Sequence, residues 1–161
     1  MCGYAGMAVS SKSISVLTSE LLGAMGDSIR LRGPDDQGVW LDSSLGLGLV
    51  HQRLAIQDLS PLGAQPMHSI SGRYTIAFNG EIYNFKQLKA RLVVLGFQFK
   101  GGSDTEVILA AFEAWGIGSA LIDFVGMFSI ALFDRQEQIL TLARDRMGEK
   151  PLYWGWSDNV L

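Results

Sequence analysis

The sequence has one cysteine, two histidines and no long apolar run, and each scarcity excludes a class of protein. A single cysteine excludes an internal disulfide and any metal site built from several cysteines. His51 and His68 have no acidic neighbours spaced as zinc ligands, so we expect no metal site. No apolar stretch approaches the ~20 residues of a membrane-spanning helix, so we expect no membrane partner.

Charge of either sign is also sparse. The net charge of −3 gives no electrostatic reason to expect nucleic acid or an anionic membrane surface as a partner. The apolar first residues have no basic segment before them, so we predict no secretion signal and a cytoplasmic location. A chain of 161 residues that is 48% hydrophobic is suited to one domain with a sizeable core.

The apolar pattern predicts strands in hairpin-like groups and helices in separate blocks. Strands are expected at residues 3–9, 38–41, 45–50, 53–56, 74–78, 81–83, 127–134 and 138–144, and from 152 onward. Helices are expected from 14 to about 30, from 85 to 95, and from 104 to about 115. Because strand and helix do not alternate regularly, the pattern favours antiparallel sheets with helices on their faces.

Local signals predict one turn and two helix starts. Asn79-Gly80 is typical of a tight hairpin turn between two strands. Asn84 and Ser103 each carry Gln or Glu three residues later, which is the pattern of a capping box. We therefore interpret Glu106 as a capping residue.

The single cysteine stands at position 2, where its small side chain favours removal of Met1 by a methionine aminopeptidase. The freed α-amine, with an ordinary pKa of about 7.7–8.0, could then serve as the base for the thiol of the same residue. Alternatively, Cys2 is a small apolar residue at the start of a strand. Position alone favours that alternative.

Eight short motifs change this balance. Their order along the chain is Cys2-Gly3-Tyr4-Ala5-Gly6, Arg32-Gly33-Pro34-Asp35, His51-Gln52-Arg53-Leu54-Ala55-Ile56, Gln65-Pro66-Met67, Asn79-Gly80-Glu81-Ile82-Tyr83-Asn84, Ser103-Asp104-Thr105-Glu106, Gly126-Met127-Phe128, and Ala143-Arg144-Asp145-Arg146 through Lys150-Pro151-Leu152-Tyr153. Together they resemble the N-terminal glutaminase domain of glutamine-hydrolysing asparagine synthetases, over essentially the whole chain. Each motif alone is weak, whereas their joint order and spacing are specific.

The resemblance implies an α+β fold of the N-terminal-nucleophile (Ntn) hydrolase type, a four-layer αββα sandwich. It also implies that Cys2 attacks the side-chain amide of glutamine, which gives a glutamyl thioester and ammonia before water releases glutamate. Asn79, through its side-chain amide, and Gly80, through its backbone N–H, would form the oxyanion hole. The turn and this catalytic role are compatible, because a turn that requires glycine can expose an N–H group.

The resemblance further implies a set of substrate-binding residues. Arg53 would hold the α-carboxylate of glutamine with two parallel donors, although a lone arginine is otherwise usually a surface residue. Asp104 would bind the α-ammonium, although an acid in the first turn of a helix is also favourable against the helix dipole. The complete expected set is Arg53, Leu54, Ala55, Ile56, Gln57, Asn79, Gly80, Glu81 and Asp104. Arg32 and Asp35 are expected to shape the loop beside the nucleophile.

We predict one type 2 glutamine amidotransferase domain over residues 1–161, with no cofactor of its own. Asparagine synthetases also have a C-terminal domain that uses ATP and magnesium to activate aspartate and receives ammonia through a tunnel. We therefore expect a truncated chain whose partners are glutamine and that synthetase domain, and a homodimer is left open. The alternatives are an amidotransferase domain serving another acceptor, as in hexosamine or purine synthesis, and a non-catalytic glutamine-binding module that retains Met1.

Overall fold

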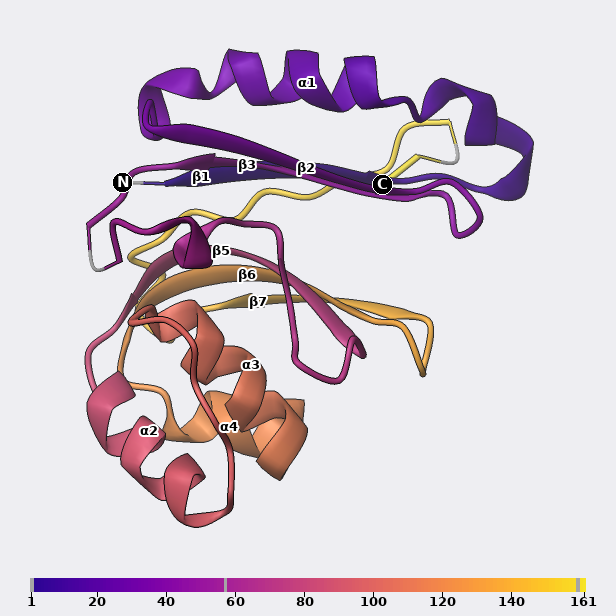
Figure 1. Ribbon diagram of the computed structural model, residues 1–161. Helices are drawn as coiled ribbons and strands as arrows, with labels where there is room; N and C mark the ends of the chain where they lie inside the picture. The colour runs from indigo at the N-terminus through magenta and orange to yellow at the C-terminus, as the bar shows by residue number, and fades with distance from the viewer. Residues whose placement is uncertain (1, 57, 159) are drawn as a thin grey trace.

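Two antiparallel β-sheets lie face to face at the centre of the fold (Figure 1). The structure is a computed structural model that describes residues 2–56, 58–158 and 160–161. The first sheet has the order β1-β3-β2, with β1 (Gly3–Ala8), β3 (Leu47–Arg53) and β2 (Asp36–Asp42). The second has the order β4-β5-β6-β7, with β4 (Met67–His68), β5 (Tyr74–Ile82), β6 (Gly126–Asp134) and β7 (Ile139–Arg144).

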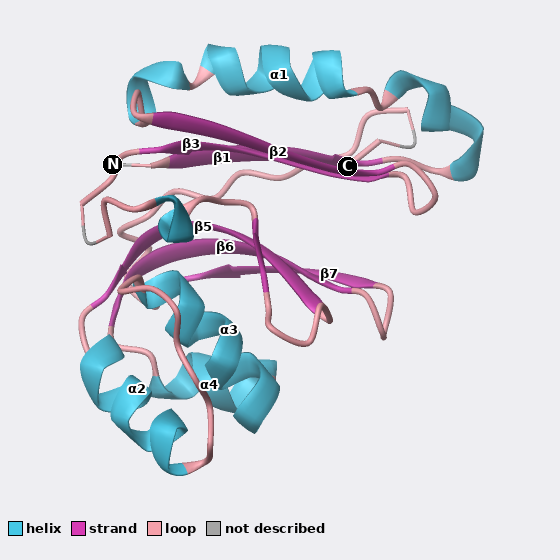
Figure 2. Ribbon diagram, viewed as in Figure 1, coloured by secondary structure: helices cyan, strands magenta, loops and turns pink. Residues whose placement is uncertain are grey.

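Helices cover the outer face of each sheet, as Figure 2 shows. The first sheet is covered by α1 (Ser19–Ser28). The second is covered by α2 (Phe85–Val94), α3 (Asp104–Trp115) and α4 (Ile117–Asp123). Short 3-10 helices span Ser11–Val16, Arg30–Arg32 and Pro61–Gly63. This arrangement is the predicted four-layer αββα sandwich, so the expected fold class is confirmed.

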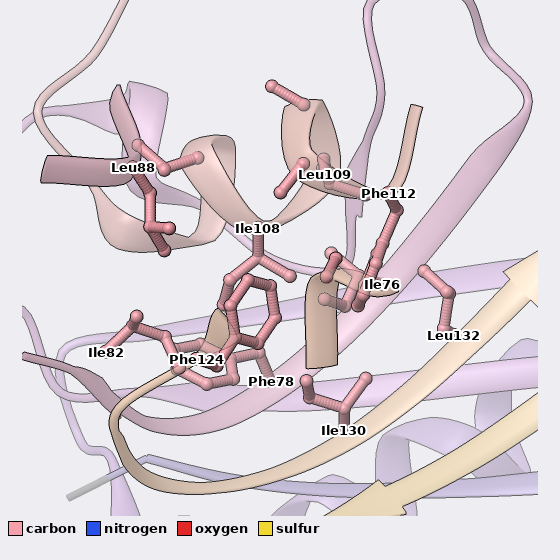
Figure 3. Packing of buried hydrophobic residues seen from close by; sticks show 14 of the residues in the cluster. Ile76, Phe78, Ile82, Leu88, Ile108, Leu109, Phe112, Phe124, Ile130 and Leu132 are labelled. Carbon is pink, nitrogen blue, oxygen red and sulfur yellow. The ribbon is translucent and has the colours of Figure 1, made fainter. Parts of the chain in front are cut away.

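The largest hydrophobic cluster fills the space between the second sheet and its helices (Figure 3). Ile76 and Phe78 of β5 belong to this cluster, whereas Ala77 between them packs with Leu49 of the first sheet. Side chains alternate between the two faces of a strand, and the face of β5 toward the other sheet carries the smaller residues. Ala77 and Ala131 therefore let the two sheets approach closely.

The first helix begins later than its apolar pattern predicted. Residues 11–16 form a 3-10 helix, and the α-helix starts only at Ser19. The hydroxyl of Thr18 accepts the N–H of Leu21 at 3.2 Å, which satisfies one of the unpaired amides of the first turn. The cap fixes the helix start, although the apolar spacing continues before it.

The predicted hairpin turn at Asn79-Gly80 is wrong. Both residues lie inside the continuous strand β5, where Asn79 is opposite Ser129 and Gly80 is opposite Phe128 of β6. A Cβ atom on Gly80 would lie 2.7 Å from Phe128 Cα, which is closer than atoms pack. Glycine is needed here because two backbones approach closely, and no turn is involved.

The capping boxes are wrong in one case and half right in the other. The Asn84 side chain makes no capping bond, and instead bonds Asp123 O at 2.9 Å and Val125 N at 3.1 Å. Ser103 does cap α3, because its hydroxyl accepts the N–H of Glu106 at 3.4 Å. The carboxylate of Glu106 instead accepts the N–H groups of residues 100 and 101, and so orders the preceding loop.

Three further segments differ from expectation. The sequence did not predict α4, which is separated from α3 only by Gly116. Residues 54–56 and 152–155, expected to be extended strands, belong to no strand. The other expected strands are present with boundaries shifted by a few residues. In the part of the chain that is described, no helix combines the length and apolar character needed to cross a membrane.

Candidate active site

A cavity of about 150 Å³ lies where the ends of β1 and β3 meet the middle of β5. Nine of the ten residues expected to form the site line this one cavity, although they come from four separate segments. They are Cys2, Arg53, Leu54, Ala55, Ile56, Asn79, Gly80, Glu81 and Asp104. The tenth, Gln57, lies outside the described residues.

The thiol of Cys2 is held at one wall of the cavity. Its sulfur accepts the N–H of Leu54 at 3.3 Å and lies 3.6 Å from the carbonyl oxygen of the same residue. The loop that carries Leu54 is fixed in turn by Asp35, whose carboxylate accepts the N–H of Ala55 at 2.8 Å. Asp35 therefore shapes the loop beside the cysteine, as expected.

One edge of β5 provides a backbone donor. Because β4 pairs only with an earlier part of β5, the later part of this edge is bonded by side chains. The N–H of Phe78 donates to Gln65 Oε1 at 2.7 Å, and that of Ile82 donates to Asp104 Oδ2 at 3.0 Å. Amides two residues apart in a strand point to the same edge. The N–H of Gly80, midway between them, therefore points to this edge, beside the cavity that Gly80 lines.

The side chain of Asn79 points to the face of β5 that lies toward the first sheet, and so it sits between the two sheets. The residue is 6% exposed, and its Oδ1 is buried without a hydrogen bond to any described residue. An unsatisfied buried polar atom costs about 1–3 kcal/mol, and a catalytic role is one reason for a protein to retain one. Asn79 also lines a larger cavity of about 480 Å³ between the sheets.

Arg53, the last residue of β3, brings a buried positive charge to the cavity wall. Its Nη2 donates to the carbonyl oxygen of Asp58, and Gly63 leaves room for the guanidinium, whose Cζ would lie 3.1 Å from a Cβ there. The Asp58 carboxylate accepts the hydroxyl and N–H of Ser60 and the N–H of Gly102. These bonds, the Ser60 hydroxyl foremost, lower the pKa of Asp58 to about 2.

Asp104 brings a buried carboxyl group to the cavity that Arg53 also lines. It is the first residue of α3 and is 6% exposed. Burial, with a smaller contribution from the neighbouring charge of Glu81, raises the pKa of this carboxyl to about 6. Its bond to Ile82 N shows that Asp104 serves the fold as well as the cavity.

Sequence reasoning assigned no role to five polar or flexible residues of the cavity wall, namely Asp58, Gln65, Thr105, Met127 and Lys150. All but Asp58 lie within one of the quoted motifs, and that was the only signal. Lys150 is 2% exposed, and its backbone N–H donates to Asp145 Oδ2 at 2.9 Å. A charged side chain this deeply buried could not be inferred from its position in a polar turn.

A cysteine, a backbone N–H on a strand edge and two opposite charges thus lie in or beside one cavity. Residues 1–161 match the family described as glutamine amidotransferase domain, and the chain belongs to that family. A solved structure of glutamine phosphoribosylpyrophosphate amidotransferase from Bacillus subtilis has the same fold, with a TM-score of 0.77. That comparison covers 99% of this chain and 40% of the other, at 20% sequence identity.

Relatives with substantial sequence identity to this chain are larger proteins. Asparagine synthetase [glutamine-hydrolyzing] 2 of Bacillus subtilis is 42% identical over 96% of this chain and 20% of its own length. Amidase chry2 of Gibberella zeae is 41% identical over 84% of this chain and 20% of its own length. The resemblance to asparagine synthetases is thus confirmed, and the chain spans about a fifth of these relatives' length.

Proposed function

We propose that this chain hydrolyses glutamine to glutamate and ammonia, with Cys2 as the nucleophile after removal of Met1, which lies outside the described residues. The observation that carries the proposal is the shared cavity. Cys2 and the strand edge that carries the Gly80 N–H both line it. A nucleophile needs a donor that stabilises negative charge on the attacked carbonyl oxygen.

In the proposed reaction, the free α-amine of Cys2 takes the thiol proton, and the sulfur attacks the side-chain carbonyl carbon of glutamine. The carbonyl oxygen becomes negative and is held by the Gly80 N–H and the Asn79 side-chain amide, which is worth about 3 kcal/mol per donor in comparable sites. The ammonium returns its proton as the C–N bond breaks, so ammonia leaves and a thioester remains. Water, activated by the same amine, then attacks the thioester to give glutamate and the thiol.

The two ends of glutamine's amino-acid group match the charges in the cavity. We infer that Arg53 binds the α-carboxylate and that Asp104, with Glu81, binds the α-ammonium. Leu54, Ala55 and Ile56 line the same wall. Gln57, outside the described residues, stays a predicted substrate-binding residue. Opposite charges at fixed positions select a zwitterion and orient its side chain toward the cysteine.

We further propose that the ammonia is used by a synthetase domain outside these residues, which would activate aspartate with ATP and magnesium in the cytoplasm. The larger cavity, which Asn79 also lines, would be the route for this ammonia. A different acceptor remains the second candidate. It is supported by relatives named amidases, which are 41% and 35% identical to this chain.

The test is glutamate release from glutamine by the purified chain, with intact mass used to confirm loss of Met1. We expect turnover in the processed chain and its abolition by Cys2→Ala, with unfolding in urea confirming that the variant is folded. Turnover unaffected by Cys2→Ala would reject the assignment. Glutamine binding without turnover in the processed chain would favour the non-catalytic module.

A further inference from the structure

Both backbone polar groups of Phe78, its N–H and its carbonyl oxygen, are bonded from outside the second sheet. Phe78 directly precedes Asn79 and lies two residues before Gly80 in β5, so the position of its backbone affects both proposed oxyanion donors. Its N–H donates to Gln65 Oε1 at 2.7 Å, and its carbonyl oxygen lies 3.1 Å from Nε2 of His51. Two side chains thus take the place of a neighbouring strand, beyond the point where β4 stops pairing with β5.

His51 reaches this carbonyl from the other sheet. It lies in β3, the central strand of the first sheet, with 0% of its surface exposed. Burial lowers the pKa of the ring to about 4, so the ring is neutral at neutral pH and carries one N–H. A carbonyl oxygen only accepts, so that N–H is on Nε2 and donates to Phe78. Nδ1 is buried without a hydrogen bond to any described residue.

Gln65 rests on the same sheet, directly beside His51. Gly38 of β2 is opposite His51 in the register, and a Cβ atom on Gly38 would lie 2.9 Å from the carbonyl carbon of Gln65. The absent side chain therefore admits the loop that carries Gln65. The amide nitrogen of Gln65 donates in turn to Thr105 Oγ1 at 3.3 Å, which fixes the orientation of its oxygen toward Phe78.

We propose that His51 and Gln65 are positioning residues of the oxyanion hole, holding the backbone of Phe78 so that Asn79 and Gly80 keep their places beside the cavity. This inference rests on the proposed glutaminase function. Neither side chain has to contact the reacting atoms. They would act through one or two residues of β5, in the part of this strand edge that lies beyond its pairing with β4. A donor displaced by a fraction of an ångström loses much of its effect on the transition state.

The kinetic test compares His51→Leu, which removes the N–H donor, with His51→Gln, which keeps one at similar reach. We expect His51→Leu to lower kcat for glutamine hydrolysis about tenfold, less than the loss of an oxyanion donor itself costs, with KM nearly unchanged. His51→Gln should recover most of that loss. The matched control is Ser69→Ala, which removes a bond to Tyr74 N at the other end of β5. It should lower stability and leave kcat unchanged.

A second measurement does not depend on turnover. Amide hydrogen exchange should be faster at residues 78–80 in His51→Leu than in the unsubstituted chain, and at residue 74 in Ser69→Ala. Gln65→Leu, which removes the acceptor of the Phe78 N–H, should reproduce the pattern of His51→Leu if the latter folds poorly. A kcat loss no larger than that of Ser69→Ala would overturn the inference, as would exchange that rises evenly along the chain. If the unsubstituted chain lacks glutaminase activity, the proposed function fails, and the exchange pattern still decides whether His51 holds this strand segment.

Discussion

Replacing Gly80 with alanine tests the close approach of β5 and β6 at the oxyanion donor. The added Cβ would lie 2.7 Å from Phe128 Cα and 2.9 Å from Phe128 Cβ, and closer still to the carbonyl oxygen of Met127. Ordinary carbon–carbon contacts begin at ~3.5 Å, so these two carbon contacts alone require the strands to separate by at least about 0.8 Å. Forcing a group into a packed region costs about 1–3 kcal/mol.

The same displacement moves the Gly80 N–H away from the position of the developing oxyanion. A misplacement of about 1 Å can cost about 100-fold in rate. We therefore expect Gly80→Ala to lower kcat for glutamine hydrolysis about 100-fold and the free energy of unfolding by about 2 kcal/mol. Glutamate release measures the first quantity, and urea unfolding measures the second.

Gly23→Ala is the matched control, because it is the same chemical change with no atom within 4 Å of the added Cβ. Gly23 lies inside α1, so alanine there should stabilise the chain by up to about 1 kcal/mol and leave kcat unchanged. A Gly80→Ala variant that keeps full turnover would refute the assignment of this N–H as the oxyanion donor.

Two other substitutions separate substrate binding from stability. Asp104→Asn should raise KM for glutamine about 10- to 100-fold, the worth of one charged hydrogen bond, with kcat little changed. Because burial raises the pKa of Asp104 to about 6, KM of the unsubstituted chain should also rise as pH falls through 6, and this rise should be absent in the variant. An unchanged KM would remove Asp104 from the site. Asp134→Asn should weaken the ion pair with Arg73, in which Nη2 lies 2.6 Å from Oδ2, and lower stability by about 1–2 kcal/mol with turnover unchanged. Arg73 lowers the pKa of Asp134, so this contribution is present above pH ~4 and lost as pH falls below it, as acid unfolding of both forms can show.

The elements that the sequence predicted well are those whose signals are local. The apolar runs at 127–134 and 138–144 correspond closely to β6 and β7, and Ser103 caps α3 as expected. The turn prediction at Asn79-Gly80 was wrong because the sequence alone does not distinguish a glycine required for close backbone packing from one required for a turn. Only the partner strand, some 50 residues later in the chain, distinguishes the two cases.

The site itself was recognisable from the order of the motifs, but its supports were not. The resemblance implied that Cys2, Arg53 and Asp104 carry chemistry, and the structure brings them to one cavity. The role of His51 depends on a single carbonyl in the other sheet, and no spacing along the sequence encodes a contact between strands 27 residues apart. Asp104 likewise binds Ile82 N in addition to lining the cavity, a second role visible only in three dimensions.

The most direct test of the account is to look for the thioester on Cys2. The chain with Met1 removed and the chain with Met1 retained would each be mixed with glutamine, quenched rapidly in acid and mapped by peptide mass. We expect a glutamyl adduct on the peptide that begins at Cys2, and glutamate release, only in the chain that has lost Met1. Equal turnover by the chain that retains Met1, or turnover without any adduct on Cys2, would contradict the proposed chemistry.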